Sequence, residues 1–103
     1  MAAPYNPPVK NEDFETAICL EDMASPGSFK ANPTIAAGDF KIDLAGTLTN
    51  LTTLPSVDPA ASIWVKLALS ATEMNRDVVK IQAIDQTSPK EWADFALAIP
   101  TTQ

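Results

Sequence analysis

Apolar and polar residues alternate along five stretches of this 103-residue chain, and a period of two is typical of strands with one buried face. The clearest case is GDFKIDLAG, in which Phe40, Ile42 and Leu44 share one face. Proline and other turn-forming residues separate the stretches, and no run of ten or more residues has a helical period. The pattern predicts strands near residues 13–21, 39–45, 61–69, 78–85 and 92–99.

Short strands separated by turns predict an all-β fold, a small antiparallel β-sandwich or a small barrel, and we expect the sandwich. The spacing of Ser70 and Glu73 is that of a capping box, so we expect one helical turn between two of the strands. The core is predicted from the apolar face of each strand and includes Ile42, Val65, Leu67, Ile81 and Leu97.

The first eleven residues, MAAPYNPPVKN, contain three prolines and show no hydrophobic period. Proline fixes φ and favours an extended predecessor, which predicts an extended arm over residues 1–11 ahead of a single domain over residues 12–103. Tyr5 offers an aromatic anchor, and Pro7 and Pro8 reduce the entropy lost on docking, so we place all three in a candidate partner interface. The alternative interpretation is a frayed terminus.

Two tryptophans fall on the polar side of their predicted strands. By parity, Trp64 and Trp92 each lie opposite the apolar positions of the strand. Either both faces of these strands are covered, or the rings form a contact surface for a partner. For Trp64 the covered arrangement is favoured, whereas Trp92, near the chain end and between Glu91 and Asp94, joins the candidate partner interface.

Composition excludes several classes of function. The chain has no histidine, which removes Ser-His-Asp and Cys-His catalysis. Its net charge of −6 argues against nucleic acid and against an anionic membrane as partner, because both require a basic face. The first eight residues lack the features of a signal peptide, and no apolar run is long enough to span a bilayer, so we expect synthesis in the cytoplasm.

Candidate chemical groups are few. The single cysteine, Cys19, has apolar neighbours and is expected to be a small core residue. Asp39 and Asp43 share a face but lie too far apart for one metal ion, so we expect them to be solvated, like the other carboxylates. No serine lies in a nucleophile motif. We therefore expect no enzymatic activity, no metal and no cofactor.

From Gly38 onward the chain resembles a family of small structural proteins of tailed bacteriophages. The matching segments are GDFKIDLAGT, NLTTLPSVDPAA, VKLALSATEMNRDVVKIQAIDQ and EWADFALAI. The most specific of them has the pattern LSxxEMNxDxV, which here runs from Leu69 to Val79 and in that family joins two strands. The resemblance covers about two-thirds of the sequence.

This resemblance implies an immunoglobulin-like β-sandwich and an accessory structural role in a virion, as head decoration or cement, or in neck or tail attachment. It also implies multiple symmetric copies, with other virion proteins and further copies of the chain as partners and the virion as location. The alternative is an immunoglobulin-like adhesion module that binds a host surface glycan or protein. Loops rich in Pro, Ser, Asp and Thr rather than in aromatic residues favour the structural role.

Overall fold

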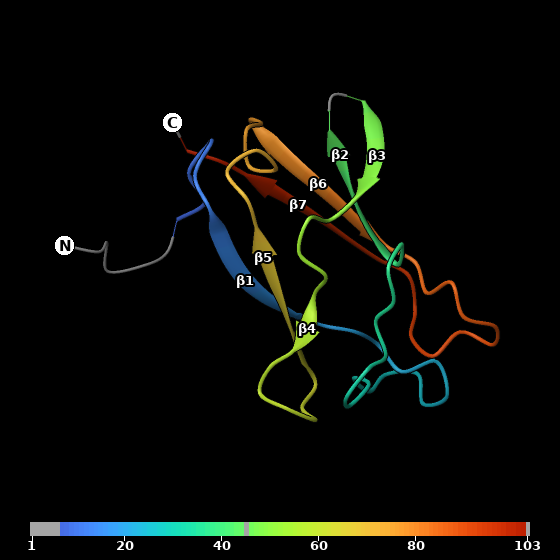
Figure 1. Ribbon diagram of the computed structural model, residues 1–103. Helices are drawn as coiled ribbons and strands as arrows, with labels where there is room; N and C mark the ends of the chain where they lie inside the picture. Colours follow the sequence, from blue (N-terminus) through green and yellow to red (C-terminus); the bar gives the residue numbers. More distant parts are fainter. Residues whose placement is uncertain (1–6, 45, 103) are drawn as a thin grey trace.

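The computed structural model describes residues 7–44 and 46–102, which form two antiparallel β-sheets (Figure 1). The strands are β1 (Phe14–Cys19), β2 (Phe40–Leu44), β3 (Thr47–Asn50), β4 (Ser56–Val57), β5 (Trp64–Leu69), β6 (Val78–Ala83) and β7 (Phe95–Pro100). One sheet has the order β1-β5-β4 and the other β3-β2-β6-β7. The described residues contain no helix, so the predicted all-β class is confirmed, and the two sheets are consistent with a β-sandwich.

The inward side chains of both sheets form one hydrophobic core. Ile42, Val65 and Leu67 are completely buried and Ile81 nearly so, as the alternation predicts. Leu97 is only partly buried and packs against the margin of this core. Burial of one face of each strand is the main stabilising contribution in a domain of this size.

Two strands lie where the alternation is weak. The threonine-rich segment after Gly46 lies outside the five predicted strands but contains β3, which pairs with β2 from Leu44–Thr47 to Lys41–Asn50. Residues 55–59 lie outside the five predicted strands, but Ser56 and Val57 pair with β5 as the short strand β4. A two-residue strand is too short to show alternation, which explains why the sequence pattern missed it.

The predicted capping box forms between β5 and β6. The Ser70 N–H donates to Glu73 Oε1 at 2.9 Å, and the Glu73 N–H donates to Ser70 Oγ at 3.3 Å. The Met74 N–H reaches the Ser70 carbonyl at 2.9 Å, which closes one turn that does not continue into a helix. Glu73 also accepts the Thr52 N–H at 2.9 Å, so this buried carboxylate joins two connections.

The segment from Pro8 to Asn11 is joined to the domain, which corrects the predicted arm boundary at residue 11. The Thr102 N–H donates to the Pro8 carbonyl, and the Lys10 N–H donates to the Thr102 carbonyl, both at 2.8 Å. The Asn11 N–H donates to the Met74 carbonyl at 3.1 Å. Tyr5 lies outside the described residues.

Candidate interaction surface

Trp92 lies in the core, so its predicted place in a partner interface is wrong. Its side chain is 0% exposed, and the indole N–H donates to the Thr34 carbonyl at 3.1 Å. The ring packs against Phe40, with ring centroids 5.9 Å apart. The alternation pattern assigns Trp92 to the wrong face because β7 begins only at Phe95. The backbone at Trp92 does not continue that strand and makes an isolated bridge with Asp22.

Among the described residues of the predicted interface, Trp92 lies apart from Pro7 and Pro8. Trp92 precedes the first residue of β7, whereas Pro8 lies beside Thr102, which follows its last residue. The length of this strand therefore separates them. Pro7 and Pro8 are both half-buried against the domain.

Trp64 is the exposed tryptophan, with 46% of its surface accessible. It is the first residue of β5 and stands opposite Cys19 of β1, on the side of the sheet that faces away from the core. The arrangement in which both faces of the strand are covered is therefore wrong for Trp64. Cys19, expected in the core, is half-buried beside it and forms no disulfide.

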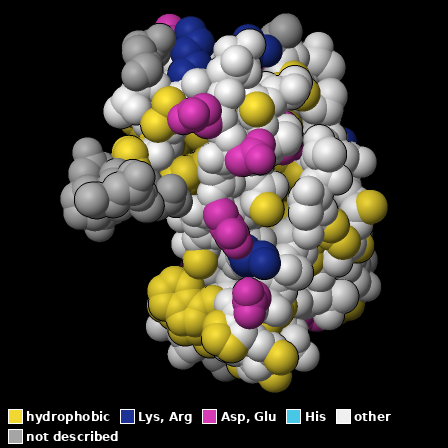
Figure 2. All heavy atoms as spheres, turned by 60° about the vertical axis from the view of Figure 1, so that its left-hand side comes forward, with side chains coloured by type: hydrophobic (Ala, Val, Ile, Leu, Met, Phe, Trp, Pro, Cys, Tyr) yellow, Lys and Arg dark blue, Asp and Glu magenta, His cyan; other side chains and the backbone are white. Residues whose placement is uncertain are grey.

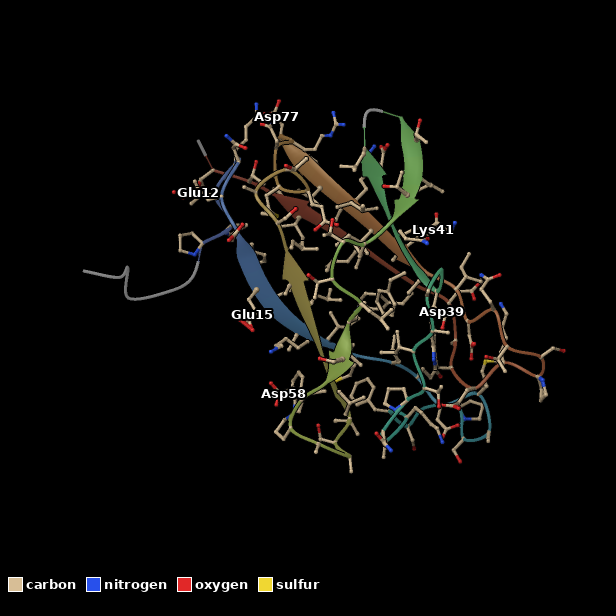
Figure 3. All side chains as sticks on the ribbon, in the orientation of Figure 1. Glu12, Glu15, Asp39, Lys41, Asp58 and Asp77 are labelled. Atoms are coloured by element: carbon tan, nitrogen blue, oxygen red, sulfur yellow. The ribbon has the colours of Figure 1, made fainter. Side chains whose placement is uncertain are left out.

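The outer side of the three-stranded sheet combines this ring with small side chains and paired charges. We call it the Trp64 face; it comprises Glu15, Ala17, Cys19, Ser56, Asp58, Trp64, Lys66 and Ala68. Lys66 Nζ lies 3.6 Å from Glu15 Oε1 and 3.7 Å from Asp58 Oδ2. Figure 2 shows acidic and basic side chains in a column on this side, with hydrophobic atoms gathered at its lower end. Figure 3 shows Glu15 and Asp58 pointing away from the sheet.

Such a surface suits contact with another protein. Exposed aromatic rings contribute large contact areas at interfaces, and tryptophan is enriched among the residues that dominate binding energy. Ala17 and Ala68 allow a partner to approach the backbone closely. Lys66 pairs with both carboxylates and compensates one of their two negative charges, which lowers the cost of covering these groups relative to unpaired charges.

The other sheet carries a hollow of about 590 Å³ on its outer face. Ala96 and Ala98 of β7 line it, together with Leu48 of β3 and the polar side chains Asp43 and Lys80. Asp43 Oδ1 already accepts the Gly46 N–H at 2.9 Å and so helps to form the turn between β2 and β3. The hollow is open and its lining includes no aromatic side chain, so the Trp64 face is the better candidate for a partner contact.

Asp39 is buried, which corrects the expectation that it is solvated. One carboxylate oxygen accepts the Ala36 N–H at 2.9 Å and the other accepts the Gln86 N–H at 3.1 Å. Its own N–H and carbonyl bond to the Ala36 carbonyl and the Ile84 N–H. Parity placed Asp39 outside because it was counted as part of a strand, whereas it ends the turn that precedes β2. Its role is to join two connections at one end of the sheet.

Asp85 performs the same task within the connection from β6 to β7. Its carboxylate accepts the Glu91 N–H at 2.7 Å and the Thr87 N–H at 2.9 Å. Burial alone raises the pKa of Asp85, but the hydrogen bonds from these N–H groups outweigh burial and hold the pKa below its ordinary value of 3.8. The ionised form is therefore the one that the fold stabilises.

Among residues 7–44 and 46–102, no three cysteine or carboxylate side chains gather closely enough to hold a metal ion. The same residues contain no helix long and apolar enough to cross a membrane. Comparisons of the chain with protein-family models, with curated proteins and with solved structures find no match.

Proposed function

We propose that this protein is an accessory structural component of a tailed-bacteriophage virion, present in several symmetric copies as head decoration or at the neck or tail. The Trp64 face carries the proposal, because it joins an exposed aromatic ring to small side chains and to charges that are paired within the chain. This composition serves adhesion between proteins rather than chemistry. The resemblance of the segments from Gly38 onward to phage structural proteins supplies the class of particle.

We also infer that the two sheets are immunoglobulin-like. In that fold one sheet orders its strands A-B-E-D, and the other pairs C with F and F with G, with C′ added beside C in the variable type. The sheets here support this assignment if β1 to β7 correspond in chain order to B, C, C′, D, E, F and G. The order β1-β5-β4 then corresponds to B-E-D, and β3-β2-β6-β7 to C′-C-F-G.

The proposed docking arm comprises the residues that precede Pro8, because the backbone from Pro8 onward is hydrogen-bonded to the domain. Thr102 pairs with the backbone on both sides of Val9, so the next step of this parallel ladder would bring Pro8 and Pro100 together. Neither proline has an N–H to donate, which ends the pairing there. Within this arm, Tyr5 is the proposed anchor on another virion subunit, and Pro7 limits the entropy lost on docking.

An adhesion module for a host surface glycan or protein is the second candidate. The exposed rings of Trp64 and Phe29, at 46% and 58% accessibility, are the observation in its favour, because aromatic rings stack on sugars and on protein surfaces. The internally paired charges of the Trp64 face favour the structural role.

Mass spectrometry of purified virions, combined with negative-stain images of particles that carry a labelled copy, tests the proposal. We expect the protein in stoichiometric amounts and the label at symmetric positions. Absence of the protein from purified particles would contradict a virion role. Binding of the isolated protein to host cell envelopes, without incorporation into particles, would favour the adhesion module.

A further inference from the structure

Three of the four edge strands carry features that discourage pairing with another chain. The short strand β4 lies between Pro55 and Pro59, and β3 has only four residues. The edge strand β7 contains Pro100, and isolated bridges at Val9–Thr102 and at Asp22–Trp92 close the backbone beyond its two ends. Short strands, prolines and covered ends are the usual protection of a sheet edge.

The fourth edge strand, β1, is neither short nor interrupted by proline; the isolated bridges Glu21–Phe29 and Asp22–Trp92 close the backbone beyond its last residue. It is six residues long, FETAIC, without proline or glycine, and it lies at the end of the order β1-β5-β4. Within the described part of the chain no strand pairs with its outer side, which Figure 1 shows at the margin of the sheet. An edge of this length presents a row of backbone donors and acceptors to another strand.

The outward backbone groups of β1 can be identified from the neighbouring strands. The Asp58 N–H donates to the Trp64 carbonyl at 3.1 Å, so the even-numbered residues of β5 direct their backbone groups to β4 and the odd-numbered residues direct theirs to β1. These odd-numbered residues stand opposite the even-numbered residues of β1, as in the pair Thr16–Leu67. The odd-numbered residues of β1, with Ala17 at their centre, therefore direct N–H and C=O groups to the open edge.

We propose that β1 pairs antiparallel with β1 of a second copy of this chain about a two-fold axis, joining the two three-stranded sheets edge to edge. An interface between identical chains is self-complementary when the same strand meets itself in this way. In such a pair, core-facing side chains of one β1 stand opposite core-facing side chains of the other only if the two-fold axis passes through a residue position. An axis between two residues would place core-facing side chains opposite outward-facing ones. Of the registers with the axis on a residue, the two with the greatest overlap centre on Thr16 or on Ala17.

Both registers suit the side chains of this strand. They place Glu15 opposite Ala17 or Cys19 of the second copy and keep the two glutamates apart, so no like charges meet directly. Phe14 and Thr16, which are half-buried at the margin of the core, become covered by the partner strand. Trp64 stands beside Cys19 on the same face, so the joined sheet is continuous with the Trp64 face.

This contact deepens the proposed function, on which its biological role rests, by naming how copies of the chain meet. A single strand pair covers less surface than a stable dimer interface, so each contact is weak in solution. Repetition by the symmetry of a particle makes such weak contacts sufficient. Self-association of the pure protein tests the contact, whereas the virion role is tested separately by incorporation into particles.

The experiment compares the full chain with Ala17→Pro and Ala98→Pro by sedimentation velocity over a concentration series. Ala17→Pro removes an N–H from the open edge of β1 and leaves the ladder to β5 intact. Ala98→Pro is the matched control, because it also removes an N–H that points away from the neighbouring strand. Thr102 donates its N–H to the Pro8 carbonyl and not to β6, and Ala98, four residues earlier, directs its N–H to the same side of β7. Circular dichroism and thermal melting establish that both variants fold.

We expect the wild-type chain and Ala98→Pro to dimerise with equal affinity, and Ala17→Pro to dimerise about tenfold or more weakly, because two symmetric hydrogen bonds are lost. A wild-type chain that stays monomeric at the highest concentration, or equal loss in both variants, overturns the proposal. Loss of association in a variant that lacks residues 2–6 also overturns it, because the N-terminal segment would then be the occupant of the edge.

If Ala17→Pro fails to fold, cysteine cross-linking tests the same contact. In a Cys19→Ala background, a disulfide-linked dimer is expected on mild oxidation from Ala17→Cys if the axis lies on Ala17, or from Thr16→Cys if it lies on Thr16, whereas Ala98→Cys in the same background stays monomeric. Cross-linking from Ala98→Cys equal to that from the better of the two β1 variants would contradict pairing through β1.

Discussion

The alternation pattern predicts the same outward orientation for both tryptophans, but one ring is buried and the other is exposed. Trp92 is 0% exposed, donates its indole N–H to the Thr34 carbonyl and packs on Phe40. Trp64 is 46% exposed and stands among small and ion-paired side chains on the outer face of β5. The difference arises because Trp64 lies within a strand and Trp92 lies just before one. Parity holds only while the strand continues, so one ring supports the fold and the other is available to a partner.

The largest effect is expected from Trp92→Ala, which should lower the free energy of unfolding by about 3–5 kcal/mol. The substitution leaves a cavity beside Phe40 and leaves the Thr34 carbonyl without its donor. Urea denaturation of the variant measures the loss. A loss below about 1 kcal/mol would show that the ring is not a core side chain.

Truncation of the strand core should cost slightly less. Leu67 is completely buried in β5, and Leu67→Ala is expected to lower the free energy of unfolding by ~2–5 kcal/mol. Ala68→Ser, at the next position but on the outer face, is the control and should be nearly neutral. Equal losses in the two variants would contradict the facing of this strand.

Acid should loosen the connection that Trp92 adjoins. The pKa of Asp85 lies below its ordinary value in the folded chain, so the unfolded chain binds the proton first. The stabilisation is complete well above pH 3.8, declines as the pH falls through this value, and disappears below the folded-state pKa. Asp85→Asn should cost on the order of 2 kcal/mol at neutral pH and flatten the dependence of stability on pH in this acid range. An unchanged pH profile would contradict it.

The smallest effect on stability is expected from Trp64→Ala, within about 0.5 kcal/mol of the wild type, because almost half of the residue's surface is already in water. Acrylamide quenching sharpens the contrast between the two rings. In a Trp92→Phe background the remaining tryptophan should be strongly quenched, and in a Trp64→Phe background it should be protected. Similar quenching of both would remove the distinction between the rings.

The sequence was sufficient for the parts of the fold that depend on local alternation. The facing of Phe40 and Ile42, and of Val65 and Leu67, follows from period two, and the capping box at Ser70 follows from local spacing. The order of the strands in the two sheets was beyond local reasoning, because pairing joins residues distant in the chain.

The errors at the candidate site have the same cause. The alternation pattern assigns Trp92 and Asp39 to strands that begin only after them. Their position in the alternation therefore does not predict which way their side chains face. Backbone contacts between distant segments turn both side chains inward, as the bridge between Asp22 and Trp92 illustrates. The alternation pattern places Trp64 correctly on the face of β5 that points away from the core. Whether another segment covers that face depends on how the chain packs, which alternation does not predict.

Incorporation into particles tests the central claim, that the Trp64 face is a contact surface of a virion component, most directly. Trp64→Ala competes with wild-type protein during assembly, and Val78→Ala is the control, since Val78 on β6 is 43% exposed but lies on the other sheet. We predict that Trp64→Ala is incorporated at least about fivefold less than wild type, whereas Val78→Ala is incorporated normally. Equal incorporation of the two variants would contradict the claim.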